Sequence, residues 1–388
     1  MSQKILMGLL GARGDCVYGT TIAHQIKEDF PGCRLTWAIA EKNQDILRNN
    51  PHVDEVWPVV AEVPDSWSVW LPFAEEAMRL GARGVFDRVF LPQICPGNYQ
   101  NYDGTVRPSL FRGYGRPITV PVRGHVILDE SEKQAVQDFI SAHDILSYRH
   151  RVLFECGGGS GQTHMTLEHA LEAALMVVKE LPDACCLMST HLAIESPHKN
   201  IIAANSVSYR GNLELAEHST LLAGCSSGVS ALVTTCADQN PLPTIQFVKG
   251  SVSVYASMIH DFAHWQLETH NFIEMRDTTA RETANAIIAV CREGFQAVRG
   301  RLHQEPVVHF KHYAPTILGT LIKPGRFIDA ARSLSLVAER YGWRRDIIGL
   351  SRLVVTEFPK ERLLLREPHI RFMRDFAKAL LKSIRNGV

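Results

Sequence analysis

Short apolar runs alternate with amphipathic stretches through the first part of the chain. Apolar runs bounded by turn residues predict buried strands, whereas apolar residues three or four apart predict helices. Strands are expected at 4–10, 34–40, 55–60 and 85–91, and helical segments near 20–30, 43–49 and 73–80. This alternation predicts a parallel sheet with helical crossover connections.

The periodic pattern stops between residues 92 and 124, where prolines and glycines recur every few positions. A long stretch without a periodic pattern is typical of a loop region that covers a site. After it, a helix is expected from about 129 to 143, preceded by the apolar residues 126–128. The sequence therefore predicts a division between two parts of the chain near residue 124.

A second unit of strand, glycine turn and helix begins at residue 151. The strand is expected at 151–156, the turn at 157–161 and the helix at 167–181; later elements are expected at 184–189, 213–222, 229–236 and 244–248. A second start of this kind predicts a second α/β domain. The expected divisions are 1–123, a connecting segment 124–150, a second domain 151–305 and a helical C-terminal extension 306–388.

The last helix of this extension is amphipathic. Its apolar stripe is Phe372, Phe376, Leu380 and Ile384, and its opposite face carries Arg371, Arg374, Lys378, Lys382 and Arg385. Such a helix either packs on the protein body with a solvated basic face or docks on an anionic membrane surface. Because burying four large apolar side chains outweighs the surface attraction of the cations, we expect it to pack on the body.

Composition narrows the class of protein. The 388 residues are 45% hydrophobic and 21% charged, which is ordinary for a globular enzyme of two domains. The formal net charge is zero, so wholesale nucleic-acid binding is not indicated. No apolar run approaches the length of a membrane span, and Arg13 and Asp15 interrupt the one segment that resembles a signal peptide. We therefore expect a cytoplasmic protein, with peripheral contact to the inner membrane as the alternative role of the C-terminal helix.

The cysteines and histidines indicate neither a metal site nor disulfides. Nine cysteines are an odd number and form no C-x-x-C pair, so reduced and mostly buried thiols are expected. None of the 17 histidines stands at a recognisable metal-ligand spacing, and H-E-x-x-H and G-x-S-x-G are absent from the sequence. The sequence also lacks D-x-D, the usual carboxylate clamp for a metal on a sugar nucleotide. We therefore expect no metal site and metal-independent chemistry.

The first candidate for a functional residue is Asp15, in the glycine-rich turn that follows the first strand. In open α/β sheets, ligands bind at the carboxyl ends of the strands, where this turn is expected to lie. The acid would then face a ligand. Its alternative role is that of N-cap for the following helix.

Two further glycine-rich turns stand between a strand and a helix, at 157–161 and 224–228. Glycine lets the backbone approach a phosphate closely, and a helix N-terminus presents free N–H groups to an anion. Together the two turns would grip a nucleoside diphosphate from both sides. Alternatively the first turn binds nothing, and Ser226 or Ser227 of the second is only a helix N-cap.

Several motifs together resemble the lipopolysaccharide heptosyltransferase-like glycosyltransferases of family 9. Residues 11–15 with Thr20 and Thr21 are similar to the family's opening G-A-x-G-D and downstream T-T/P. Residues 30–37 are similar to FP-x-A-x-I-x-W, and residues 50–56 to NP-x-VDEV. The resemblance covers roughly residues 4–295 and implies the α/β GT-B fold: two Rossmann-like domains with parallel sheets facing a central cleft.

The resemblance also implies an activity and a site. Asp15 would be the catalytic base on the acceptor hydroxyl, and no cofactor would be needed besides a nucleotide-diphosphate sugar as donor. The acceptor would be a glycan or lipid-linked glycan, in the synthesis of bacterial surface polysaccharide or lipopolysaccharide. Donor contacts are expected from the following residues: Gly14, Gly158, Gly159, Ser160, Thr163, His164, Glu195, Ser226, Ser227 and Gly228.

The donor side departs from the family pattern. In the family's N-D-S-G-x-x-H loop, the Asp is replaced here by Ser226 and the His by Ala231. The family's phosphate-binding Lys is replaced around Thr163 and His164. An ADP-heptose donor is therefore not implied. Two alternatives remain open: a nucleotide-sugar 2-epimerase of GT-B architecture, and a binding protein that has lost catalysis.

Overall fold

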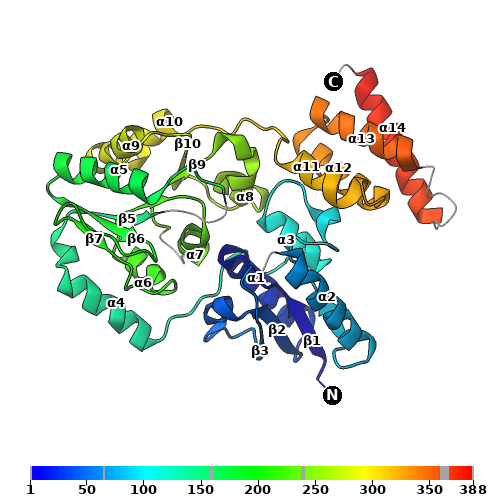
Figure 1. Cartoon of the computed structure of the whole chain (residues 1–388), viewed down its shortest axis with the longest axis horizontal. Coiled ribbons are helices and arrows are strands. Elements are labelled where there is room, and N and C mark those ends of the chain that lie inside the picture. Colours follow the sequence, from blue (N-terminus) through cyan, green and yellow to red (C-terminus); the bar gives the residue numbers. More distant parts are fainter. Residues whose placement is uncertain (1, 64–65, 157–160, 237–240, 359–366, 387–388) are drawn as a thin grey trace.

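The computed structural model of the chain describes residues 2–63, 66–156, 161–236, 241–358 and 367–386 (Figure 1). Two parallel sheets, one of four strands and one of six, form the centres of two α/β domains. A group of helices at the C-terminal end of the chain lies beside the N-terminal domain (Figure 1). The expected α/β fold class with two parallel sheets is confirmed.

The N-terminal sheet has the strand order β3-β2-β1-β4, and all its neighbouring strands are parallel. The two central strands, β1 and β2, are apolar runs of buried residues, whereas the edge strands β3 and β4 contain only half-buried and exposed residues. The elements are β1 (Lys4–Gly8), α1 (Arg13–Asp29), β2 (Arg34–Ala40), η1 (Glu41–Leu47), β3 (Glu55–Val59), α2 (Trp67–Ala82), β4 (Arg88–Phe90), η2 (Tyr99–Asn101) and α3 (Arg107–Tyr114).

Helix α1 begins at Arg13, well before the expected start near residue 20. The sequence reads as a loop here because Gly14 and Gly19 lower helix propensity. The glycines are needed for packing: a Cβ at Gly19 would lie 2.4 Å from Leu9 Cδ2 and 2.8 Å from the Trp37 ring. Close approach of α1 to the sheet therefore overrides propensity.

The expectation of an uninterrupted loop from 92 to 124 is wrong. This segment contains η2 and α3, and two of its loop-like residues, Pro108 and Gly115, mark the ends of α3. Pro108 stands in the first turn of the helix, where its missing N–H costs nothing, and Gly115 ends it with a φ of 80°.

The connecting segment leads through α4 (Glu130–Ala142), which starts with a capping box between Asp129 and Glu132. The second sheet has the order β10-β9-β8-β5-β6-β7, all parallel. Its elements are η3 (Ile145–Ser147), β5 (His150–Glu155), α5 (Leu167–Glu180), β6 (Ala184–Ser189), β7 (Ile201–Ala203), α6 (Gly211–Glu217), β8 (Leu221–Gly224), α7 (Gly228–Cys236), β9 (Thr244–Val248), η4 (Gly250–Ala256), α8 (Met258–His264), β10 (Phe272–Arg276), α9 (Ala280–Glu293) and α10 (Phe295–Leu302).

The single helix expected at 213–222 is wrong as well. Helix α6 ends at Glu217 and the chain enters strand β8 at Leu221. Both elements are short, and runs of four to seven residues show too few periods to separate a helix from a strand. Pairing with β5 and β9 decides the matter for β8.

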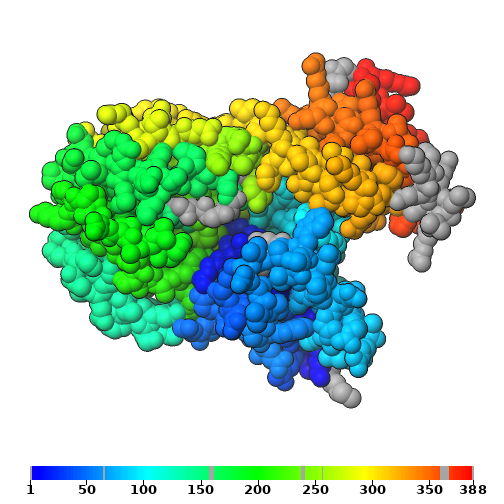
Figure 2. All heavy atoms as spheres, in the orientation of Figure 1, coloured from blue at the N-terminus to red at the C-terminus, as the bar shows by residue number. Residues whose placement is uncertain are grey.

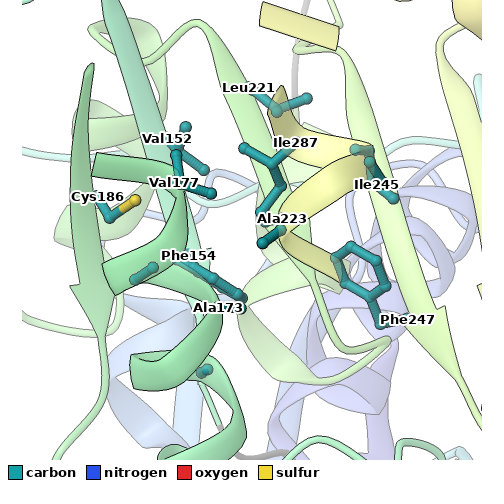
Figure 3. Close-up of a cluster of buried hydrophobic side chains, with 14 of the residues drawn as sticks. Val152, Phe154, Ala173, Val177, Cys186, Leu221, Ala223, Ile245, Phe247 and Ile287 are labelled. Atoms are coloured by element: carbon teal, nitrogen blue, oxygen red, sulfur yellow. The ribbon is translucent and has the colours of Figure 1, made fainter. Parts of the chain in front are cut away.

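The core of the second domain lies between the sheet and helices α5 and α9 (Figure 3). Val152 and Phe154 on β5 contact this layer together with Val177 of α5 and Ile287 of α9, and all are buried. A second apolar cluster on the opposite face of the sheet involves α4 and α6. Both faces are covered, as parallel sheets require.

The C-terminal extension consists of α11 (Tyr313–Ile317), η5 (Leu318–Ile322), α12 (Phe327–Tyr341), α13 (Arg345–Glu357) and α14 (Glu367–Arg385). It returns to the N-terminal domain, where the Ser333 hydroxyl on α12 donates to the Tyr102 carbonyl at 2.5 Å. Helix α12, orange in Figure 2, therefore contacts a segment more than two hundred residues earlier in the chain.

Helix α14 packs on the body, as expected. Phe376 and Leu380 are 4% and 3% exposed, and the Phe376 ring lies 5.9 Å from that of Trp343. The cations on the opposite face are all exposed: Arg371, Arg374, Lys378, Lys382 and Arg385. All nine cysteines are free thiols, seven of them buried. Among the described residues, no helix is long and apolar enough to cross a membrane.

Candidate functional site

A cavity of about 880 Å³ lies between the two α/β domains. Its wall includes the start of α1 and the start of α7, which follow the carboxyl ends of β1 and β8. Open α/β sheets bind their ligands at this position. Of the residues predicted for the site, the cavity is lined by Gly14, Asp15, Ser226, Ser227 and Gly228.

Asp15 is half-buried in the first turn of α1, two residues after the helix begins. The N-cap is Ala12, whose side chain cannot accept a hydrogen bond. The alternative interpretation of Asp15 as N-cap is therefore wrong. The carboxylate lines the cavity, and the adjacent helix N-terminus favours its charged form.

Gly14 brings the two domains into contact. A Cβ at this position would lie 3.2 Å from Ala231 Cβ and 3.7 Å from Gly228 Cα, both on α7. The N-terminal ends of α1 and α7 thus approach each other closely at the cavity wall. The side chain of Ala231 has no room to grow toward α1, which gives the small residue at this position a packing reason.

The loop that includes Ser226 and Ser227 is held by a carboxylate that sequence reasoning missed. Glu155, at the end of β5, is 3% exposed. It accepts hydrogen bonds from the backbone N–H groups of Cys225 at 3.1 Å, Val229 at 3.0 Å and Ser230 at 3.3 Å. The hydroxyls of Ser227 and Ser230 also donate to it.

Glu155 changes the expected chemistry of this loop. The amide groups at the start of α7, which would be donors to a phosphate, already have an anionic partner supplied by the protein. The Ser226 amide donates to the Gln246 side chain at 2.6 Å. The backbone N–H groups that donate to Glu155 and Gln246 are therefore already occupied and are not available to a phosphate.

Three other predicted donor residues, Thr163, His164 and Glu195, are outside the set of residues that line the cavity. The Thr163 hydroxyl donates to the Phe247 carbonyl at 2.7 Å, and His164 Nε2 lies 2.7 Å from the Thr278 carbonyl oxygen. Neither residue is among those that line the cavity, and neither is Glu195, which is exposed. Gly158, Gly159 and Ser160 lie outside the described residues. The structure therefore gathers part of the predicted set in one place.

A second acid in the cavity wall was not predicted. Asp261 on α8 lines the cavity and pairs with Arg107 on α3 through a 2.9 Å contact between Oδ2 and Nε. Burial raises the pKa of Asp261 to about 6, although the charge of Arg107 opposes the shift. The Arg107 guanidinium also lies 4.4 Å from the centre of the Tyr18 ring, which faces the cavity. No short sequence motif joins residues so far apart.

Basic groups are few in this wall. Among the described lining residues, Arg13 and His191 are basic, whereas Asp15, Asp45, Glu155 and Asp261 are acidic. Arg13 is itself engaged, with Asp45 Oδ2 at 3.1 Å and the Tyr209 ring centre at 4.6 Å.

The chain has two α/β domains, each built on a parallel sheet, with a ligand-sized cavity between the strand ends of the two sheets. This architecture is the GT-B fold. A solved structure of a glycosyl transferase of family 9 from Veillonella parvula shares it. The TM-score is 0.52 at 14% identity, over 71% of this chain and 86% of that one. The GT-B fold implied by the family 9 motifs is confirmed.

Two other solved structures are similar at lower scores. E. coli ADP-heptose lps heptosyltransferase II has a TM-score of 0.44 at 12% identity, over 74% of this chain and 98% of that one. A putative UDP-N-acetylglucosamine 2-epimerase from Listeria monocytogenes has a TM-score of 0.45 at 10% identity, over 89% and 98%. No protein-family model matches the sequence, and no curated protein matches it.

Proposed function

We propose that the protein is a glycosyltransferase that moves a sugar from a nucleotide-diphosphate donor to a glycan acceptor. The observation that carries the proposal is that Asp15 and the loop of Ser226–Gly228, singled out separately in the sequence, line the same cavity between the domains. The volume of that cavity is in the range of small-molecule sites. The family 9 motifs at the start of the chain support the same reaction.

In the proposed reaction, the acceptor hydroxyl attacks the anomeric carbon of the donor sugar. A new C–O bond forms as the bond from that carbon to the diphosphate oxygen breaks, which inverts the anomeric configuration. Asp15 takes the hydroxyl proton as general base. His191 and Ser226, which line the same cavity, would lie beside the departing diphosphate, whose charge grows in the transition state.

We further propose that the reaction needs no divalent metal, because the sequence lacks a D-x-D clamp. The acceptor would be a glycan or lipid-linked glycan of the bacterial surface. The exposed cationic face of α14 supports peripheral contact with an anionic membrane, where such acceptors are found. The donor sugar is left open, since the donor loop departs from the family pattern.

Asp15→Asn should keep the fold and the donor affinity but lower the transfer rate about 100-fold or more, the scale of a lost general base. Donor binding is measured by calorimetry with UDP-, GDP-, ADP- and CMP-sugars, and transfer with the donor that binds. Asp138→Asn, an exposed acid on α4, is the matched control and should transfer at the native rate. Native turnover in Asp15→Asn would remove Asp15 from the mechanism.

The same assays test an alternative. Four acidic side chains around the cavity, one of them paired with the buried Arg107, also suit a nucleotide-sugar 2-epimerase, which must remove and return a proton on the sugar. An epimerase would convert the donor in the absence of acceptor and exchange a sugar proton with solvent. A transferase would do neither.

A further inference from the structure

Three histidines from distant parts of the sequence meet on the N-terminal domain. His24 lies on α1, His52 in the turn before β3, and His125 at the start of the connecting segment. One ring nitrogen from each lies within 4.8 Å of the other two. The rings of His24 and His52 stack at 4.2 Å, and His125 stands edge-on to both.

The backbone around these rings is held by specific hydrogen bonds. The Asn50 side chain donates to the His125 carbonyl at 2.9 Å and accepts from the His52 N–H at 2.9 Å. The Thr20 hydroxyl oxygen accepts from the His125 N–H at 2.8 Å. Asn50 and Thr20 therefore fix the relative positions of all three segments, as supporting residues do around metal ligands.

One imidazole nitrogen of the cluster lacks a hydrogen bond within the described part of the chain. His24 Nδ1 is buried and has no hydrogen-bond partner among the described residues.

We propose that His24, His52 and His125 form a binding site for a divalent transition-metal ion such as Zn²⁺. Imidazole nitrogens favour zinc, copper, nickel and iron over magnesium or calcium. Three histidines leave the fourth position of a tetrahedral zinc site to water. To reach zinc–nitrogen bonds of roughly 2.0–2.1 Å, the His24 and His52 rings must turn out of their stack so that their in-plane lone pairs converge on the ion.

The site lies outside the cavity, since none of the three histidines lines it. His125 follows Gly124, which passes between α1 and α7: a Cβ there would lie 2.9 Å from Val17 Cγ1 and 2.5 Å from Cys236 Sγ. The Gly124 N–H donates to the Thr235 carbonyl at 2.8 Å. A metal bound to His125 would clip the connecting segment to α1, so its effect is on domain attachment and stability rather than on the sugar chemistry.

The test is calorimetric titration of the full-length, chelator-stripped protein with ZnCl₂. We expect one equivalent per chain, and a higher melting temperature with the metal. His52→Gln should weaken binding by more than about 10-fold, the lower end of what even supporting residues contribute. His270→Gln, which removes an exposed histidine outside the cluster, should bind as the native protein does.

Titration of the native protein with CoCl₂ provides a second measurement that needs no variant. A tetrahedral nitrogen site gives visible d–d bands without the sulfur-to-cobalt charge-transfer bands of cysteine ligation. Substoichiometric zinc binding, unchanged affinity in a folded His52→Gln protein, or a thiolate spectrum would each overturn the proposal. Because every readout is binding or stability, the result is independent of whether the protein transfers sugars.

Discussion

Three acids near the strand ends show how position sets the role of a carboxylate. Asp15 lines the cavity, Asp261 is buried against Arg107, and Glu155 accepts hydrogen bonds from the start of α7. The N-terminal turn of a helix has N–H groups without helical partners and a partial positive charge. At the start of α7 the Glu155 carboxylate occupies this position. The sequence pattern had predicted a phosphate of the donor there.

The raised pKa of Asp261 makes a prediction about stability. A carboxyl whose pKa is raised to about 6 binds its proton more tightly in the folded state. Its contribution to stability is therefore present below pH 4 and is lost as the pH rises through 6. Asp261→Asn cannot ionise, so from pH 4 to pH 7.5 the free energy of unfolding should shift by about 2 kcal/mol in favour of the variant, relative to the native protein.

Urea unfolding of both proteins at the two pH values measures this shift. The comparison uses the difference between pH values, so a constant cost of leaving Arg107 without a charged partner cancels. Asp138→Asn on the surface of α4 should show no such shift. A native-minus-variant difference that is the same at both pH values would mean that Asp261 is already ionised at pH 4.

At the scale of elements, helix boundaries depended on packing more than on propensity. The glycines of α1 and the prolines and glycines around α3 resemble loop signals, yet each helix packs against the N-terminal core through buried residues. The starts of α4 and α9 depend on local sequence instead. Each is marked by a capping box, Asp129–Glu132 in α4 and Thr279–Glu282 in α9.

Helix α14 separates its two faces, so variants on each face should have different effects. Phe376→Ala removes a ring that is 4% exposed and packs near Trp343, and should lower the free energy of unfolding by about 3–5 kcal/mol. Replacing Arg371, Lys378 and Lys382 by Gln removes exposed charges and should leave unfolding unchanged while weakening sedimentation with anionic vesicles.

Neutral vesicles provide the control for this pair, because the attraction depends on lipid charge. If the variant with the three Gln replacements sediments with anionic vesicles as the native protein does, the cationic face of α14 does not contact the membrane. A Phe376→Ala protein of native stability would instead show that α14 contributes little to the fold.

At the scale of the whole molecule, two arginines connect the separate parts. Arg210, from the second domain, is 1% exposed and bonds to the Asp45 and Arg48 carbonyls of the first domain and to Glu132 of the connecting segment. Arg340 of α12 bonds to Asp103 at 3.2 Å and to the His260 carbonyl at 2.8 Å. Each joins elements that are distant in the sequence and thereby sets how the domains meet at the cavity.

Arg210→Ala should destabilise the protein by about 3–5 kcal/mol, because Glu132 loses its buried cationic partner and the Asp45 and Arg48 carbonyls lose their buried donor. Loss of a link between the domains should also separate their unfolding into two transitions, seen by calorimetry. Arg48→Ala removes an exposed partner of the same Glu132 and should cost about 1 kcal/mol or less. Equal effects of the two variants would contradict the assignment of Arg210 as the interdomain link.

The sequence by itself determined the class of fold and one side of the site. Short apolar runs bounded by turn residues specified most of the strands, because a strand buried on both faces must be apolar throughout. The position of Asp15 at a strand end followed from the same local pattern. Both features depend only on residues that are neighbours in the sequence, so a short segment is enough to predict them.

The tertiary structure decided what depends on residues far apart. It placed Glu155 at the start of α7, Asp261 beside Arg107, and His24 near His52 and His125. It also bonded Thr163 and His164 to the Phe247 and Thr278 carbonyl groups, and neither residue is among those that line the cavity. Contacts of this kind arise from how domains and connecting segments pack, and no local period or spacing in the chain records them.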